Sequence, residues 1–384
     1  MKNYKLSVII IFMLTLLSGC QGNEIPDLIF SIGIGVDWQD NQIELTSEFI
    51  KPTATKEDSR EDSSAVILSG KGRTLAEASN LLSDFLPQTP LWNHVSIVLL
   101  GENLCKTDVA LVSDYLTRTT EIKHNIPLLV ISGSNPEEIF KTKPVLETYL
   151  STSLARTLKN EEKQLNMYKP VLMYEFMRKL ITPGIEPVLP QIKKVKDGEK
   201  YILSLDGLAV FKGPRMIASL NEAESKGYHY LTGKNINSGL LLINNPEDPG
   251  YFITFELTKL AAEIKPLIEK ENQRITMLIQ VHADGNFYEQ SGGGDLLRLD
   301  KYPQLEQMAE DKINAYISNC IDKAQNINSD ILGWGQLINQ ADTHFWGGIA
   351  PQWDTMFPAV NYQLQSDFII RRTYLTSKSY YFQE

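Results

Sequence analysis

The strongest constraint on the fold is the alternation of short apolar runs with amphipathic segments between residues 65 and 140. Strands are expected at 65–69, 95–100 and 126–131, and helices at 74–85, 106–116 and from 135 onward. The last two strands are continuous apolar runs, which is typical of strands buried on both faces. Because strands that alternate with helices of this length pair in parallel through crossover connections, this region is predicted to be α/β.

Two local patterns fix where helices begin in this region. Thr74 and Glu77 form a capping box, in which the threonine side chain accepts from the backbone three residues on. Asn135 followed by Pro136 is a second start signal, because proline fits the first turn of a helix.

The flanking segments extend the prediction to several domains. Strands are expected at 28–36, 43–50, 202–211, 215–220, 239–243, 250–258, 273–289 and 360–371, and helices at 147–181, 221–228, 304–324 and 330–345. Residues 53–63 are polar and are interpreted as a surface loop, and the proline-rich stretch 181–191 is interpreted as a linker. The predicted divisions are an N-terminal α/β domain (20–181), a middle β-rich domain (182–236) and a C-terminal α+β domain (237–384).

The first 20 residues resemble a bacterial lipoprotein signal. Lys2 and Lys5 precede an apolar run from Leu6 to Leu17, which at about 1.5 Å per residue is too short for a hydrocarbon core of about 30 Å. The run ends in Leu-Ser-Gly-Cys at 17–20, so residues 1–19 are predicted to be removed and Cys20 to carry a diacylglyceryl group and an N-palmitoyl chain. Because two or more acyl chains anchor a protein stably, we expect a domain outside the cytoplasm tethered to the membrane.

The net charge of the chain limits the classes of partner that it can bind by electrostatic attraction. The chain has a formal net charge of −10, and loss of the two lysines in the signal gives −12. This balance argues against nucleic acid and against electrostatic adsorption to anionic lipid. The acyl anchor would therefore hold the protein on the membrane without help from charge.

Two cysteines remain besides Cys20. Cys105 and Cys320 could form a disulfide in an exported protein. The alternative is two buried free thiols, which the apolar helical face around Cys320 favours.

No catalytic apparatus is visible in the sequence. The chain contains no G-x-S-x-G, H-E-x-x-H or P-loop motif, and "GKGRT" at 70–74 lacks the spacing of a phosphate loop. "IGIGVD" at 32–37 lacks the third glycine of a dinucleotide fingerprint. The five histidines show no i, i+2 or i, i+4 pair, so neither a metal nor another cofactor is predicted.

Four features have both a functional and a structural interpretation. His94 starts a buried strand and is interpreted as structural, and "SGGGD" at 291–295 could bind an anion through its backbone but is interpreted as a turning loop. Lys193, Lys194 and Lys196 form a short basic patch, interpreted as solvated surface. The last feature is an aromatic cluster that could line a pocket or pack the core: Trp334, Phe345, Trp346, Trp353 and Phe357.

Several stretches together resemble the Ger(x)C family, the lipoprotein C subunits of spore germinant receptors. They are the signal ending at Cys20, "IGIGVD" (32–37), "SGKGRTLAEA" (69–78), "NHVSIVLLGE" (93–102), "GLAVFKGPRMIASLNEAESKGYHYLTGK" (207–234), "DILGWGQLINQADTHFW" (330–346) and "FIIRRTYL" (368–375). The resemblance implies three mixed-sheet domains in an elongated arrangement. It also implies a place on the outer face of the cell or inner spore membrane, beside an integral-membrane A subunit and a transporter-like B subunit. No catalytic residue transfers from the family, and Cys20 is the one functional position that does.

Two functions follow as hypotheses. The first is a non-enzymatic scaffold or signalling subunit of a receptor for nutrient-triggered germination. The second is a tethered solute-binding lipoprotein that captures a small nutrient. A cell-envelope hydrolase is the weakest alternative, because it would need a nucleophile and a base that converge in the fold.

Overall fold

Two β-sheets organise the chain in this computed structural model, which describes residues 28–50, 65–161, 168–234 and 236–373. The strands of the first sheet are β1 (Leu28–Gln39), β2 (Gln42–Ile50), β3 (Val66–Gly72), β4 (Thr89–Leu91), β5 (Val98–Leu100), β6 (Pro127–Ser132), β7 (Val171–Leu172), β8 (Val188–Asp197), β9 (Lys200–Lys212) and β10 (Arg215–Leu220). The second sheet contains β11 (Leu240–Asn244), β12 (Phe252–Glu269), β13 (Arg274–Gln290) and β14 (Asn361–Arg372).

The first sheet is mixed, with order β10-β9-β8-β6-β5-β1-β2-β3. Its centre is parallel, since β1, β5, β6 and β8 pair in that direction, and its two ends are antiparallel hairpins. The predicted parallel pairing of the 95–100 and 126–131 strands is therefore confirmed.

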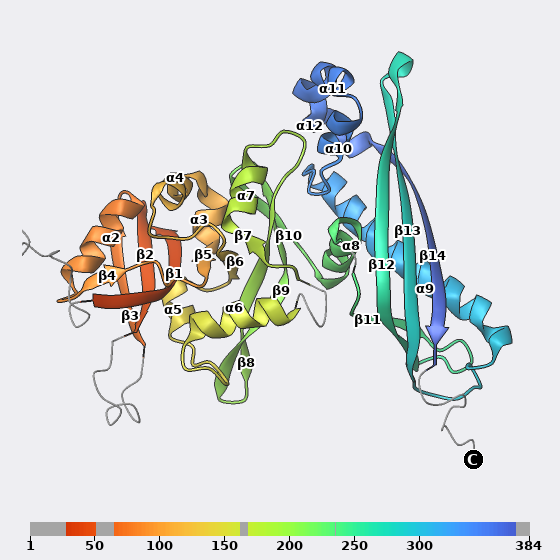
Figure 1. The fold of residues 1–384 in the computed structure, drawn as a ribbon, viewed down its shortest axis with the longest axis horizontal. Helices are drawn as coiled ribbons and strands as arrows, with labels where there is room; N and C mark the ends of the chain where they lie inside the picture. Colours follow the sequence, from red (N-terminus) through yellow and green to blue (C-terminus); the bar gives the residue numbers. More distant parts are fainter. Residues whose placement is uncertain (1–27, 51–64, 162–167, 235, 374–384) are drawn as a thin grey trace, which may run out of the picture.

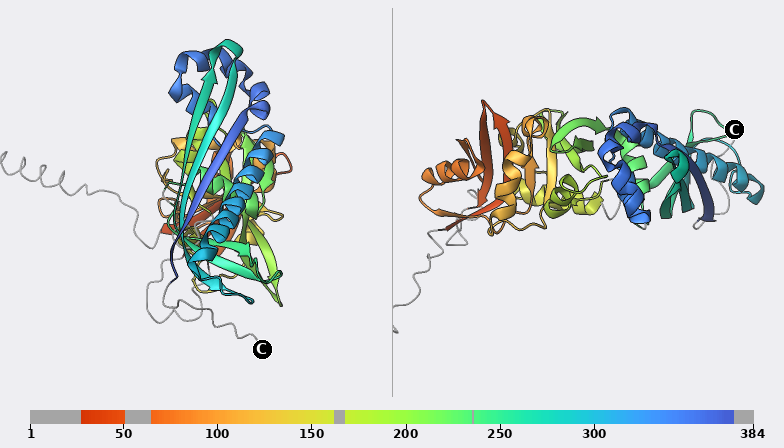
Figure 2. Two further views of the ribbon diagram at one scale, coloured as in Figure 1. Left: turned by 90° about the vertical axis from the view of Figure 1, so that its right-hand side faces the viewer. Right: turned by 90° about the horizontal axis from the view of Figure 1, so that it is seen from above.

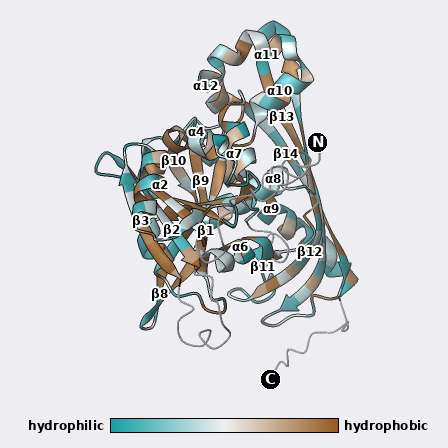
Figure 3. Ribbon diagram, turned by 60° about the vertical axis from the view of Figure 1, so that its left-hand side comes forward, coloured by the Kyte–Doolittle hydropathy of each residue, from teal (hydrophilic) through white to brown (hydrophobic). Residues whose placement is uncertain are grey.

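Helices cover both faces of the first sheet. They are α2 (Leu75–Asp84), α3 (Glu102–Thr107), α4 (Ala110–Arg118), α5 (Pro136–Phe140), α6 (Leu150–Asn160) and α7 (Met173–Leu180). Side chains of α2, α3, α4 and α7 pack in one apolar core, and those of α5 and α6 pack in another. Figure 3 shows hydrophobic residues along the strands of this sheet and hydrophilic residues on its turns, as a layered core requires.

The second sheet has order β11-β12-β13-β14 and is antiparallel except for the β13–β14 pair. The 25-residue helix α9 (Tyr302–Asn326) packs against it with an apolar stripe that includes Ile313, Ile317 and Cys320. Four further helices belong to this half: α8 (Glu222–Thr232), α10 (Trp334–Ala341), α11 (Thr343–Ile349) and α12 (Trp353–Met356). Figures 1 and 2 show the two sheets and their helices side by side along the longest axis, with α8 between them.

Both predicted helix starts are confirmed. Glu77 N donates to Thr74 Oγ1 at 3.2 Å, and Glu138 N donates to Asn135 Oδ1 at 2.9 Å. The hairpin between β1 and β2 turns through Asp40 and Asn41, both at positive φ, which is the geometry that matches the twist of its strands.

Three predicted helices are wrong in extent. The helix at 106–116 is interrupted because Asp108 is extended and its carboxylate accepts from Ala110 N at 2.8 Å. The helix at 330–345 begins only at Trp334 and is divided at Asp342, which caps α11. The segment 147–181 is α6, β7 and α7 rather than one helix.

The linker predicted at 181–191 is also wrong in its second half. Residues 188–191 belong to β8, are buried and lie between β6 and β9. Pro190 is tolerated because the β8–β9 register shifts next to it, between Pro190 and Ile192. The first sheet thus continues through the boundary predicted at 181/182, and the division into three domains stays a prediction. The polar loop predicted at 53–63 lies outside the described residues.

Candidate functional site at the junction of the two sheets

The junction is built by two short backbone segments that contact each other. Glu186 N, just before β8, donates to Asp330 O at 2.8 Å, and Gln336 N donates to Gly184 O at 2.9 Å. Ser329 Oγ donates to Phe211 O at 2.7 Å, so the same turn also holds β9. These contacts join the first sheet to the helices that follow α9.

Asp330 is the central side chain of this junction. Its carboxylate accepts from Trp334 N at 2.9 Å, Gly335 N at 2.8 Å and Trp353 Nε1 at 3.0 Å. The residue is 5% exposed, and burial raises the pKa of its carboxyl group from 3.8 to about 6, against the opposing effect of these hydrogen bonds. The carboxylate lies at the N-terminus of α10, where the helix dipole favours a negative charge.

The backbones approach closely at this point. A Cβ added to Gly335 would lie 2.6 Å from Gly184 Cα and 2.6 Å from Trp346 Cη2. Gly184 has φ +77°, which a side chain would strain. The contact therefore requires glycine on both sides.

The predicted aromatic cluster is core. Trp334 is fully buried, and Trp346, Trp353 and Phe357 are each at most 6% exposed. The rings contact one another edge-on or tilted, with centroids 5.4 Å apart for Trp346–Trp353 and 5.8 Å for Trp334–Phe357. Phe345 packs against the same core from a partly buried position. The pocket interpretation is wrong for these side chains, which pack in the core, where Trp353 also donates to Asp330.

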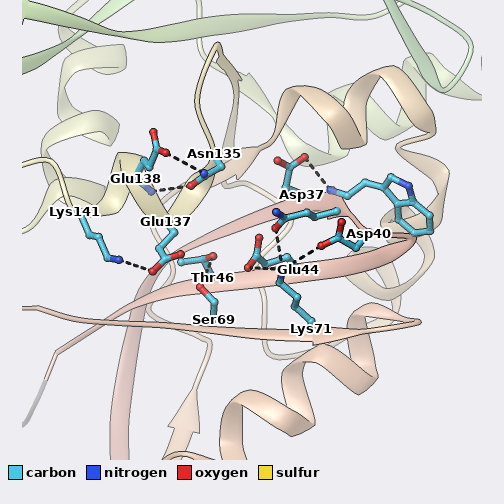
Figure 4. A network of polar contacts seen from close by, with 12 residues as sticks. Asp37, Asp40, Glu44, Thr46, Ser69, Lys71, Asn135, Glu137, Glu138 and Lys141 are labelled. Atoms are coloured by element: carbon cyan, nitrogen blue, oxygen red, sulfur yellow. Dashed lines mark hydrogen bonds and ion pairs between the residues drawn. The ribbon is translucent and has the colours of Figure 1, made fainter.

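A second buried carboxylate, that of Asp37, lies in the first sheet and connects β1 to α3 (Figure 4). Asp37, at the end of β1, accepts from Trp38 N at 2.8 Å and from Leu104 N of α3 at 3.0 Å. It occupies the space that the missing side chain of Gly101 leaves, and burial raises the pKa of the Asp37 carboxyl group.

A polar network next to Asp37, whose cross-strand partner is Glu44, connects β3 to the β1–β2 hairpin. Lys71 Nζ lies 3.7 Å from Glu44 Oε1 and 3.9 Å from Asp40 Oδ2, and the Thr46 and Ser69 hydroxyl groups form a hydrogen bond of 2.8 Å between β2 and β3 (Figure 4).

Among the described residues, no three histidine, cysteine, aspartate or glutamate side chains are grouped to hold a metal ion.

The remaining sequence candidates have structural surroundings. The prediction that His94 starts a buried strand is wrong, because β5 begins at Val98 and His94 is exposed in the turn before it. Its ring lies edge-on to Phe30, with ring centroids 5.0 Å apart. Lys193 pairs with Asp206 at 2.7 Å, and Lys194 lies over the ring of Tyr201. Cys105 and Cys320 are free and buried in different halves, and burial raises the pKa of both thiols.

The glycine-rich loop at 291–295 is held by side chains from neighbouring segments. Gln290 Nε2 donates to Gly294 O at 2.8 Å, and Asn245 Nδ2 donates to Gly293 O at 3.0 Å. Gly293 N donates to the Asp248 carboxylate at 2.8 Å, so the chain itself supplies an acceptor for that N–H group. The interpretation as a turning loop is confirmed, since Gly292 and Gly294 both have positive φ.

An apolar groove of about 780 Å³ lies between α8, α9 and the edge strand β11. Leu240, Leu242 and Phe252 line it and remain more than 40% exposed. The sequence pattern did not single out this surface, because residues 240–243 are all apolar; in the strand, Leu240 and Leu242 lie on the exposed face.

Cys20 lies outside the described residues. No helix in the described parts of the chain combines the length and apolarity needed to cross a membrane.

Comparison with known proteins places the chain in a family. Residues 21–194 match the family described as "Spore germination protein N-terminal domain", and residues 206–374 match "Spore germination B3/GerAC like, C-terminal". The chain therefore belongs to the Ger(x)C family, whose members are subunits of membrane-associated germinant receptors that act in spore germination.

Individual relatives agree with this assignment. The putative spore germination protein YfkR of Bacillus subtilis (strain 168) is 24% identical over 339 residues, covering 83% of each chain. Spore germination protein B3 of the same organism is 23% identical over 378 residues, covering 96% of this chain and 98% of the relative. The crystal structure of the GerBC protein shares the fold at a TM-score of 0.54 and 18% identity, covering 88% of this chain and 97% of GerBC.

Proposed function

We propose that this chain is the lipid-anchored C subunit of a nutrient germinant receptor and acts there as a non-enzymatic scaffold or signalling component. The observation that carries the proposal is the pair of family matches, which together extend from residue 21 to residue 374. The first match begins directly after Cys20, which supports cleavage before that cysteine and acylation of its thiol and amino groups.

The proposed partners are an integral-membrane A subunit and a transporter-like B subunit. The proposed location is the outer face of the cell or inner spore membrane, reached through the acyl chains on Cys20. A scaffold role is supported by the junction, where backbone hydrogen bonds join the segment before β8 to the turn after α9 and to α10.

The test is a crosslinking pulldown from dormant-spore membranes with mass spectrometry of the recovered partners. Recovery of a polytopic transporter-like protein and a large membrane subunit is expected. Recovery of the chain without either partner, together with normal nutrient germination in a deletion strain, would overturn the receptor proposal.

A tethered solute-binding lipoprotein is the second candidate. One observation favours it, a cavity of about 570 Å³ between the two halves of the chain. This volume falls in the range of small-molecule sites. Calorimetry of the purified chain separates the candidates, since tight binding of a small molecule without partners favours the second.

A further inference from the structure

The cavity at the junction has walls from both halves of the chain. Val188 and Leu208 of the first sheet line it on one side, and Ile264 of β12 and Leu332 line it on the other. Its lining also holds four cationic side chains, which are Lys169, Arg178, Lys179 and Lys234. An apolar wall with convergent charged groups is the usual composition of a small-molecule site.

These four cations are not paired with carboxylates in the described part of the chain. Glu175 is the one carboxylate among the residues that line the cavity. It is directed at its own helix, where it accepts from Leu172 N at 3.2 Å. Lys179 Nζ donates to the phenol oxygen of Tyr228 at 3.3 Å. The cavity therefore gathers a formal charge of about +3 in a chain whose net charge is −10.

Interaction with helix dipoles explains the positions of only two of these four cations. Arg178 and Lys179 lie in the last turn of α7, where cations offset the helix dipole. Lys169 precedes that helix, and Lys234 follows the end of α8. His229 also lines the cavity, and burial together with the charge of Lys169 lowers its pKa to about 4, so its ring is neutral at pH 7.

We propose that this cavity binds a small organic anion, with a carboxylate or phosphate group among the four cations and an apolar body against Val188, Leu208 and Leu332. Arg178 offers the planar fork that matches both groups, and the three lysines add positive charge. A ligand held this way touches α7 and the segment after α8 at once, so it would stabilise the contact between the two halves. This inference deepens the solute-binding candidate and does not depend on the receptor proposal.

The test is isothermal titration calorimetry of the full chain in non-ionic detergent with three probes. Phenyl phosphate carries both an anion and an apolar body, inorganic phosphate carries the anion alone, and benzyl alcohol carries the ring without the charge. The expected order of affinity is phenyl phosphate, then inorganic phosphate, with no saturable binding of benzyl alcohol. Absence of saturable binding of phenyl phosphate would overturn the proposal.

A double variant locates the site. Lys169→Gln with Lys234→Gln removes two exposed rim cations and is expected to weaken phenyl phosphate binding at least tenfold. Lys196→Gln with Lys259→Gln changes the net charge equally at exposed positions away from the cavity lining and should leave binding unchanged. Equal binding by both double variants would overturn the proposal.

A stability measurement separates a binding role from a structural one. If the rim lysines serve a ligand, their removal relieves repulsion in the empty cavity, and the melting temperature of the free protein stays the same or rises. If they serve the fold, the melting temperature falls, and loss of binding follows from loss of structure. Pulldown of receptor partners tests the receptor proposal separately, and its failure would leave these binding results unchanged.

Discussion

Asp330 is a buried carboxylate whose described hydrogen bonds come from two backbone N–H groups and one indole, with no cation among them. Such a group keeps its charge at a cost in desolvation, which the three donors offset only in part. It links the turn after α9, the start of α10 and α12. We therefore expect the ionisation of Asp330 to change the free energy of unfolding of the protein.

The first prediction is a pH dependence carried by Asp330. Because the folded pKa is raised from 3.8 to about 6, the folded protein holds this proton more tightly than the unfolded chain. The contribution of Asp330 is therefore most favourable below about pH 4, declines as the pH rises toward about 6, and is constant above that. A shift of about two pH units corresponds to roughly 3 kcal/mol.

Denaturant unfolding at several pH values between about 4 and 7 measures this contribution. The native chain should lose roughly 3 kcal/mol more over this range than Asp330→Asn, which cannot titrate. Asp322→Asn, at an exposed position of α9, is the charge-matched control and should follow the native curve. Parallel curves for the native chain and Asp330→Asn would show that the carboxyl group does not titrate in this window.

The second prediction concerns Cys20, the proposed site of acylation. Cys20→Ala should move the protein from the membrane fraction to the soluble fraction, because the acyl chains supply the proposed attachment. Membrane fractionation with immunodetection makes the measurement, and Cys105→Ala is the matched cysteine control. Equal membrane retention of Cys20→Ala and the native chain would refute the anchor.

Among the elements, those marked by local signals were predictable and those set by distant contacts were not. Thr74 and Asn135 cap helices through neighbours three residues away, so the sequence contains the whole signal. The start of α6 is different, because Glu48 of β2 accepts from Leu150 N at 2.9 Å and Ser151 N at 2.8 Å. About a hundred residues separate these partners, and no periodicity reports such a contact.

The same distinction applies to the junction. The aromatic residues of 334–357 were visible as a cluster, yet their role depends on Asp330 and on a glycine contact with residue 184. The cavity was not predictable for the same reason, since Lys169, Arg178 and Lys234 are spread over more than sixty residues. Only the folded chain brings them together.

The third prediction compares two glycines in neighbouring helices. Gly335→Ala places a methyl group 2.6 Å from Gly184 Cα and should destabilise the protein by about 1–3 kcal/mol, the usual cost of overpacking. Gly347→Ala, in α11, meets nothing within 4 Å and should stabilise by about 0.5–1 kcal/mol, because alanine favours helix. Urea unfolding of both variants measures the difference, and the same sign for both would contradict the tight contact.

At the scale of the whole molecule, the predicted mixed α/β and α+β content is confirmed, but the described residues form two sheets and not one for each of three predicted domains. Nothing in the sequence pattern indicated that the first sheet continues past residue 181. The proline-rich stretch at 181–191 has the composition of a linker, but residues 188–191 form the start of a strand between β6 and β9. Composition reports the local tendency of a segment, whereas strand pairing depends on a partner about sixty residues earlier.

The last prediction tests where the first folding unit ends. Fragment 21–220 contains all ten strands of the first sheet, whereas fragment 21–181 lacks β8, β9 and β10. In the shorter fragment β6 keeps its parallel neighbour β5 but loses β8 from its other edge. An open hydrophobic edge favours aggregation, and the cores that include Leu189, Ile192 and Phe211 would be incomplete. Far-UV circular dichroism and urea titration should give a cooperative transition for 21–220 and none for 21–181. If 21–181 unfolds as cooperatively as 21–220, the strands after residue 187 are an addition to an N-terminal domain that is stable without them, and the boundary at 181/182 stands.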